Sequence, residues 1–180
     1  MTHPILFTER LILRRPAAED LDGWAAFSAD PVATEHLGGP VDRSVAWRQL
    51  CTMAGAWEIN GFAMFSVIER ATGKWVGRLG PWMPDGWPGT EVGWGVAGEF
   101  AGRGYAYEGA VAAMDYAVEV LGWSEVIHTI APENTRSIRL AQRLGSTNLR
   151  PVTLPAPYAD VRVDAWGQSA DQWRAGRASR

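Results

Sequence analysis

Two glycines separated by one residue, Gly102 and Gly104, stand directly before a stretch with helical spacing. Glycine lets the backbone come close to a ligand, and the first-turn amides of a helix have no intrahelical acceptor. These amides and the positive end of the helix dipole bind phosphate groups. Residues 101–106 therefore predict a phosphate site, although a tight turn that needs two glycines is the simpler interpretation of so short a motif taken alone.

A second polar segment, residues 132–138, follows a strand-like stretch and begins another helix. Asn134 is a suitable N-cap, because its side chain can accept a bond from a first-turn amide. At about 100° per residue, Ser137 falls within the apolar arc of this helix and is expected to face the interior. The opposite side carries three arginines, which form either a solvated face or contacts to ligand phosphates: Arg136, Arg139 and Arg143.

A competing motif lies upstream. Gly93, Gly95 and Gly98 match G-x-G-x-x-G, and Glu119 follows at roughly the 20-residue spacing of a ribose-binding acid. In dinucleotide-binding folds the helix begins at the glycines, whereas helical spacing begins here only after Gly104. We therefore assign Gly93 and Gly95 to a strand with a bulge or a close backbone approach, and keep an NAD-linked enzyme as a weaker alternative.

Length and composition restrict the class of protein. With 180 residues, 47% hydrophobic and 21% charged, the chain suits one domain, placed at residues 1–167, and a polar tail at 168–180 that is expected to fray. A net charge of -3 argues against a nucleic-acid partner. One cysteine and three scattered histidines predict neither a disulfide nor a metal site. Without a signal-peptide pattern or an apolar run of about 20 residues, we expect a cytoplasmic protein and no membrane segment.

Hydrophobic spacing predicts an α/β single domain with a mixed sheet. Strands are expected at residues 11–13, 62–68, 75–79, 91–96, 126–130, 149–154 and 161–166. Helices are expected at residues 16–27, 42–60, 105–121 and 134–144. Four tryptophans are expected in the core: Trp24, Trp47, Trp57 and Trp75.

Two of these segments together resemble the GNAT superfamily of N-acetyltransferases: Ala-Gly-Arg-Gly-Tyr-Ala at 101–106 and Glu-Asn-x-x-Ser-Ile at 133–138. The stretches at 8–14 and 91–96 also match, and the chain is most similar to the RimJ/RimL-like branch, the ribosomal-protein N-terminal acetyltransferase type. Two positions depart from the family pattern. Ala101 stands where Gln or Arg is usual, and Ser146 stands where Phe is usual.

The resemblance implies a GNAT-like sheet with antiparallel N-terminal strands and helices on both faces. It also implies a splay between the fourth and fifth expected strands, 91–96 and 126–130, with acetyl-CoA in the split as co-substrate and its pyrophosphate on the amides of 102–106. The cofactor-binding residues so implied are Trp94, Gly95, Val96, Ala101, Gly102, Arg103, Gly104, Tyr105, Ala106, Asn134, Ser137 and Arg143.

Catalytic roles also follow from the resemblance. Glu91 is the candidate base, acting directly or through water, although an exposed glutamate at a strand end is an equal alternative. Backbone amides of 94–96 polarise the carbonyl. Ser137 donates to the departing sulfur, and Asn134 holds the cofactor arm.

Tryptophans at the loop after the third expected strand suggest an acceptor pocket for an apolar, planar or cationic amine: Trp82, Trp87 and Trp94. Packing on the fold alone is the other interpretation. The predicted function is acetyl transfer to a primary amine, of a protein N-terminus or a small molecule, in a ternary complex. A catalytically silent acyl-CoA-binding or sensing module is the alternative, and a homodimer is expected by resemblance to the branch.

Overall fold

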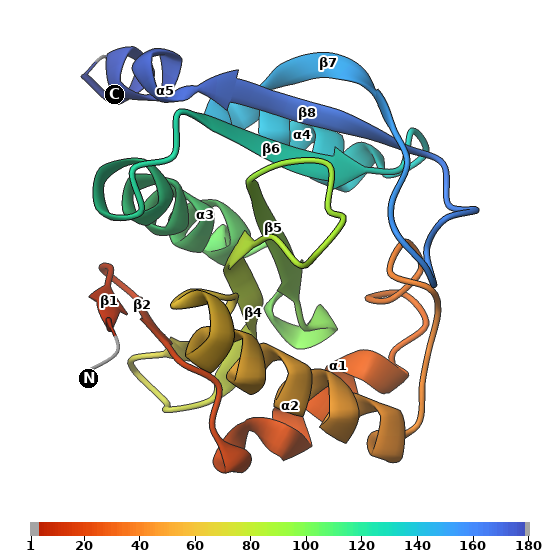
Figure 1. Cartoon of the computed structure of the whole chain (residues 1–180). Coiled ribbons are helices and arrows are strands. Elements are labelled where there is room, and N and C mark those ends of the chain that lie inside the picture. The colour runs from red at the N-terminus through yellow and green to blue at the C-terminus, as the bar shows by residue number, and fades with distance from the viewer. Residues whose placement is uncertain (1–3, 179–180) are drawn as a thin grey trace.

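The computed structural model describes residues 4–178, which form an eight-stranded sheet with helices on both faces (Figure 1). The strands are β1 (Leu6–Phe7), β2 (Leu11–Arg14), β3 (Phe65–Glu69), β4 (Trp75–Trp82), β5 (Glu91–Val96), β6 (Glu125–Ile130), β7 (Thr147–Val152) and β8 (Val163–Ser169). The helices are α1 (Leu21–Ala29), α2 (Arg43–Asn60), α3 (Tyr105–Asp115), α4 (Thr135–Leu144) and α5 (Ala170–Ala178). The predicted α/β class with a mixed sheet is confirmed.

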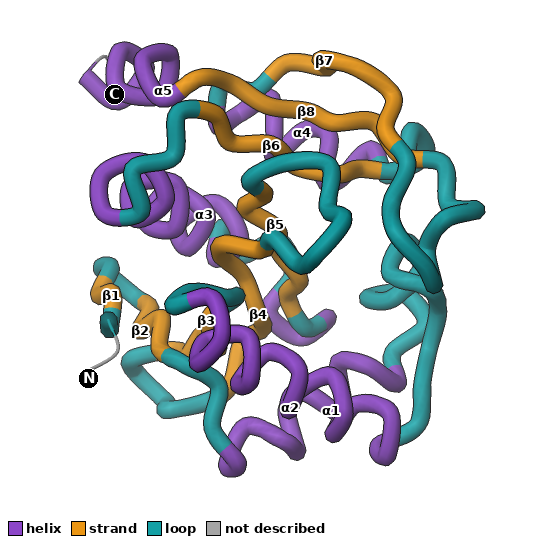
Figure 2. Tube along the Cα trace, in the orientation of Figure 1, coloured by secondary structure: helices purple, strands orange, loops and turns teal. Residues whose placement is uncertain are grey.

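The strands follow the order β1-β2-β3-β4-β5-β6-β8-β7. Every neighbouring pair is antiparallel except β5 and β6, which are parallel and register only at Glu91 and Ile127. Beyond that point the two strands diverge (Figure 2). This is the splay expected between residues 91–96 and 126–130, and it opens the sheet beside β5.

Strand alternation places α3 and α1 on opposite faces of the sheet. Leu79 of β4 meets α3 at Gly109, where an added Cβ would lie 2.5 Å from a Leu79 methyl group. The guanidinium of Arg78, the preceding residue, lies against the rings of Trp24 and Phe27 in α1. The lack of a side chain at Gly109 therefore lets α3 pack closely on the sheet.

The glycines of β5 serve close packing, and no bulge occurs between β4 and β5. Their register runs without a shift from Gly77 opposite Val96 to Trp82 opposite Glu91. A Cβ at Gly93 would lie 2.6 Å from Met64 Cε, and one at Gly95 would lie 2.8 Å from Phe27 Cζ. Of the two alternatives that the sequence left open for Gly93 and Gly95, the close approach to the backbone is therefore confirmed and the strand bulge is wrong.

Two sequence predictions about burial and order were wrong. Trp47 is 53% exposed, because the buried face of α2 carries residues 46, 50, 53 and 57, and residue 47 points about 100° away from it. The segment after Gly167 does not fray in the described range: β8 continues to Ser169 and α5 follows. Trp173 of α5 is 1% exposed and donates from Nε1 to Asp115 Oδ1 at 2.9 Å.

No helix within residues 4–178 combines the length and apolarity needed to cross a membrane. Within the same residues no cluster of three or more His, Cys, Asp or Glu is placed to hold a metal ion.

Candidate active site

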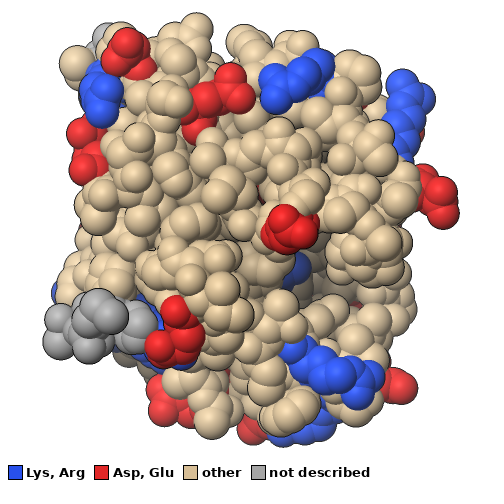
Figure 3. Space-filling view, in the orientation of Figure 1, with Lys and Arg blue, Asp and Glu red and all other residues tan. Residues whose placement is uncertain are grey.

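A cavity of about 570 Å³ lies where β5 and β6 separate. The space-filling view shows a hollow on this face, with basic atoms visible inside it (Figure 3). The cavity brings together eight of the residues predicted to bind the co-substrate or the acceptor or to act in catalysis: Trp82, Trp87, Glu91, Trp94, Gly95, Val96, Asn134 and Ser137. Residues 101–106 and Arg143 do not line it.

Glu91 lies at the start of β5 and is 6% exposed. Its Oε2 accepts hydrogen bonds from Trp87 Nε1 at 2.6 Å and from Thr129 Oγ1 at 2.8 Å. Burial raises the pKa of Glu91 to about 7, although both bonds and the positive charge of Arg78 act to lower it. The side chain therefore exchanges its proton near neutral pH, as a general base in a cavity requires.

Ser137 and Asn134 meet the cavity at the start of α4. Asn134 Oδ1 accepts from the backbone N–H of Ser137 at 3.1 Å, which is the predicted N-cap. Trp94 Nε1 donates to Ser137 Oγ at 3.2 Å. Because this bond uses an oxygen lone pair, the Ser137 hydrogen can be donated to a group in the cavity.

Residues 102–104 form a sharp turn into α3. Gly102 and Gly104 have φ angles of +76° and +81°, a region that side chains with a Cβ rarely adopt. The turn at residues 102–104 presents the backbone amides of the first turn of α3. Arg143 stacks on Tyr107, in the first turn of α3, with 3.8 Å between the guanidinium carbon and the ring centroid. Arg143 is thus brought to the predicted phosphate site, while Arg136 bonds Val32 O and pairs with Glu35.

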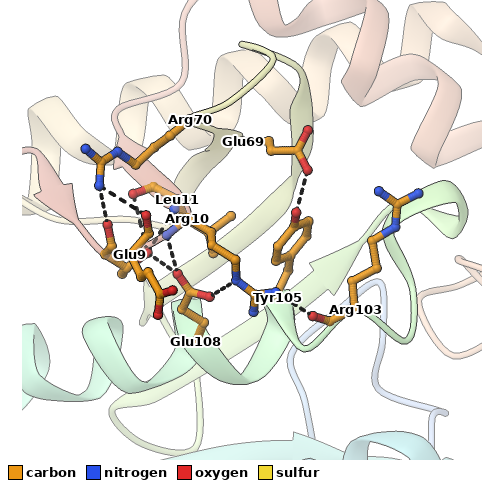
Figure 4. A network of polar contacts seen from close by, with 9 residues as sticks. Glu9, Arg10, Leu11, Glu69, Arg70, Arg103, Tyr105 and Glu108 are labelled. Carbon is orange, nitrogen blue, oxygen red and sulfur yellow. Dashed lines mark hydrogen bonds and ion pairs between the residues drawn. The ribbon is translucent and has the colours of Figure 1, made fainter.

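The turn is braced by the N-terminal segment (Figure 4). Arg10 donates from Nη1 to Arg103 O at 3.0 Å and from Nε to Glu108 Oε2 at 2.7 Å. Tyr105 donates its hydroxyl to Glu69 and does not line the cavity, so only its backbone serves the turn. The motif at residues 8–14 therefore acts by holding the turn in place.

Comparisons with known proteins agree with this geometry. Residues 10–147 match the sequence profile of the acetyltransferase (GNAT) domain family. The uncharacterised N-acetyltransferase p20 from Bacillus licheniformis is 31% identical over 142 residues, covering 77% of this chain and 80% of that protein. The chain belongs to the GNAT acetyltransferase family.

Solved structures share the GNAT fold. An acetyltransferase from Agrobacterium tumefaciens str. C58 superimposes with a TM-score of 0.81 at 31% identity, covering 93% of this chain and 95% of that one. Spermidine N-acetyltransferase from Vibrio cholerae, in complex with CoA and spermine, has a TM-score of 0.74 at 16% identity over 93% and 99% of the two chains. At that identity the second likeness concerns the fold alone.

Acetyl transfer from acetyl-CoA is the chemistry that this GNAT fold supports. The residues present suit such a co-substrate in two respects. The turn at Gly102 and Gly104 offers helix N-terminal amides to phosphates, and the cavity at the split beside β5 holds Glu91 and Ser137.

Sequence reasoning missed His128, which fills part of the GNAT split. Its ring bonds Val92 O through Nδ1 at 2.7 Å and Ser146 Oγ through Nε2 at 3.0 Å, and it packs on Trp94. A carbonyl only accepts, so Nδ1 carries the hydrogen and Ser146 donates to Nε2. Burial lowers the pKa of His128 to about 4, so the ring is neutral at pH 7.

Ser146, which stands where the family usually has Phe, hydrogen-bonds both His128 and Gln168. Gln168 donates from Nε2 to both Ser146 Oγ and Leu144 O at 3.0 Å. The serine is 3% exposed, so a buried polar network replaces the usual aromatic contact and supports the ring beside β5. Thr129 and Arg78, which also line the cavity, were missed because single polar residues within strands carry no sequence signal.

Proposed function

We propose that this chain transfers the acetyl group of acetyl-CoA to a primary amine by direct attack in a ternary complex, with Glu91 as the base. The observation that carries the proposal is the buried Glu91 carboxyl, with a pKa of about 7, in the same cavity as Ser137. We place the chain in the RimJ/RimL-like branch on its motifs at 8–14, 101–106 and 133–138.

The proposed step forms one C–N bond and breaks one C–S bond. Glu91, directly or through water, accepts the proton that the amine must lose. Backbone amides of residues 94–96 polarise the thioester carbonyl. The edge of β5 that faces β6 is unpaired beyond Glu91, so backbone groups there are open to a ligand. Ser137 donates a hydrogen bond to the departing sulfur, and the amides of residues 102–106, with Arg143 beside them, hold the phosphates.

Replacing Ser137 with Ala is expected to lower kcat by about tenfold, because one hydrogen bond to a developing thiolate is lost. Acetyl-CoA affinity is expected to change by less than about twofold, since a thiol of ordinary pKa near 8.5 leaves readily and the phosphate contacts remain. Steady-state kinetics and calorimetry on the same preparation measure both. Equal losses in turnover and affinity would contradict this role for Ser137.

Replacing Trp87 with Phe is expected to move the acidic limb of the pH-rate profile upward by about one pH unit. The Trp87 bond lowers the pKa of Glu91, so its loss leaves the carboxyl protonated to higher pH. The matched control is Trp82→Phe, because Trp82 packs on Trp87 with 6.4 Å between ring centroids while the bond to Glu91 comes from Trp87. If the acidic limb of the pH-rate profile stays in place in Trp87→Phe, the Trp87 hydrogen bond does not set the pKa of Glu91. Altered acceptor KM in both variants would place the two rings at the acceptor.

Calorimetry with acetyl-CoA tests the proposal, with CoA, dephospho-CoA and NAD as controls. We expect CoA esters to bind at micromolar concentration or tighter and NAD to give no heat. Acetylation of at least one member of a broad primary-amine panel, followed by mass spectrometry, completes the test. Binding without turnover across the panel would favour a silent acyl-CoA-binding module. No binding by folded protein would reject both.

A further inference from the structure

Arg78 is a cation in the same cavity for which acetyl transfer itself gives no task. It lies on β4 opposite Gly95, and its Nη1 contacts Met64 Sδ at 3.0 Å. Its guanidinium carbon lies 5.7 Å from the Trp24 ring centroid and 6.0 Å from that of Phe27. Among the ion pairs that residues 4–178 make, none involves Arg78.

A guanidinium removed from bulk water requires hydrogen-bond partners for its five donors. A thioether sulfur is a weak acceptor, and aromatic faces attract the charge without satisfying the remaining N–H groups. Surrounding protein desolvates the Arg78 guanidinium and lowers its pKa, while the negative charge of Glu91 acts in the opposite direction. Because Arg78 lines the cavity, its unused donors are open to a molecule there.

A second donor without an acceptor lies beside Arg78. Trp24 is 1% exposed and also lines the cavity. Its Nε1 is buried without a hydrogen-bond partner, and it is the one such side-chain atom found among the described residues. This nitrogen has no exposed surface, so Trp24 contributes its ring face to Arg78, and the guanidinium donors are the ones open to an acceptor atom on a bound molecule. A carboxylate accepts several bonds at once and carries the complementary charge.

The other charged groups of the cavity do not neutralise Arg78. Glu91 is close enough for its charge to affect the pKa of Arg78, yet none of the ion pairs found among residues 4–178 joins the two side chains. Asp85 and Arg136, the remaining Asp and Arg of the cavity wall, are both exposed, and Arg136 pairs with Glu35 at 3.8 Å. The cavity thus offers a base at one position and an unpaired cation at another.

We propose that Arg78 binds a carboxylate on the acceptor, so that the acceptor is a small amine that also carries a carboxylate, an amino acid in the simplest case. This inference rests on the proposed function, since Glu91 receives the amine of the same molecule. The cavity volume of about 570 Å³ is in the range of small-molecule sites.

Matched pairs of acceptors test the inference. Glycine, β-alanine, γ-aminobutyrate and phenylalanine are each compared with their own carboxamide, which keeps the amine and removes the charge. Acetylation gives kcat/KM for each compound, and the acid-to-amide ratio is compared between proteins so that differences in amine basicity cancel. We expect the wild type to prefer at least one acid, and Arg78→Gln to reduce that ratio by about 10- to 100-fold, chiefly through KM.

Two further variants keep the test decisive if Arg78→Gln does not fold. Arg78→Lys retains charge without the planar fork and is expected to keep part of the preference, and Arg78→Met keeps an unbranched side chain without charge or donors and is expected to lose it. Arg48→Gln, on an exposed position of α2, is the control that keeps the full ratio. Thermal stabilisation by the preferred acid gives a second readout that needs no turnover.

The outcomes separate this inference from the proposed function. If neutral amines are acetylated as well as the acids, or if Arg78→Gln keeps the wild-type ratio, the carboxylate inference is wrong while acetyl transfer stands. If acetyl-CoA does not bind and no amine reacts, the proposed function is wrong. Thermal stabilisation by an acid but not by its amide, lost in Arg78→Gln, would still support carboxylate binding at Arg78.

Discussion

Replacing Glu91 with Gln is expected to lower kcat by about 100- to 10,000-fold, the range that positioned general bases contribute. The amide keeps the size of the side chain and an oxygen for the Trp87 and Thr129 bonds, but it accepts no proton. Acetyl-CoA affinity is expected to be unchanged, because the amides of residues 102–106 lie outside the cavity that Glu91 lines. Stopped-time acetylation assays and calorimetry measure the two quantities.

The pH dependence gives this experiment a signature. Burial raises the pKa of Glu91 to about 7, so below pH 7 the carboxyl is mostly protonated and cannot act as base. Wild-type kcat should therefore fall about tenfold per pH unit below pH 7 and level above it, while Glu91→Gln should lose this limb. Glu125→Gln, at an exposed carboxylate of β6, is the control. A Glu91→Gln enzyme with wild-type rate and limb would exclude Glu91 as the base.

Replacing Gly102 with Glu is expected to weaken acetyl-CoA binding by about 100-fold. The residue has φ +76°, so a Cβ strains the turn by about 1 to 2 kcal/mol and lets its amides leave their present positions. The added carboxylate also repels the phosphates that the turn is proposed to bind, by about 1 kcal/mol or more at contact distance. No atom lies within 4 Å of the Cβ position, so the side chain itself meets no steric obstacle.

Two other glycine variants separate strain from charge. Gly102→Ala introduces the strain alone and should weaken binding by about tenfold. Gly61→Glu is the matched control, since Gly61 has φ +77° with nothing within 4 Å and caps the end of α2. Calorimetry with acetyl-CoA is the measurement. If Gly61→Glu weakens binding as much as Gly102→Glu, general destabilisation would explain the result and the phosphate site would lie elsewhere.

The sequence by itself determined the α/β class and most of the helices and strands, whereas β1, α5 and the placing of β8 between β6 and β7 were not predicted. Regular spacing of apolar residues located α2 and α4, because one face of each helix must be buried. Glycines at 102 and 104 located the turn before α3, because only glycine adopts those φ angles without strain. Asn134 was recognised as a cap for the same local reason. Each of these signals depends on neighbours within a few residues of the chain.

The tertiary structure alone decided the chemistry of the site. The sequence left Glu91 open between a base and an exposed strand-end glutamate. Its raised pKa arises from burial, while the hydrogen bonds from Trp87 and from Thr129 on another strand act to lower it. Arg78 acquires its unpaired position only because β4, β5 and α1 surround the cavity. Solvation and charge depend on groups that are distant along the chain, so a pattern of neighbouring residues predicts where a helix begins but not how strongly a carboxyl holds its proton.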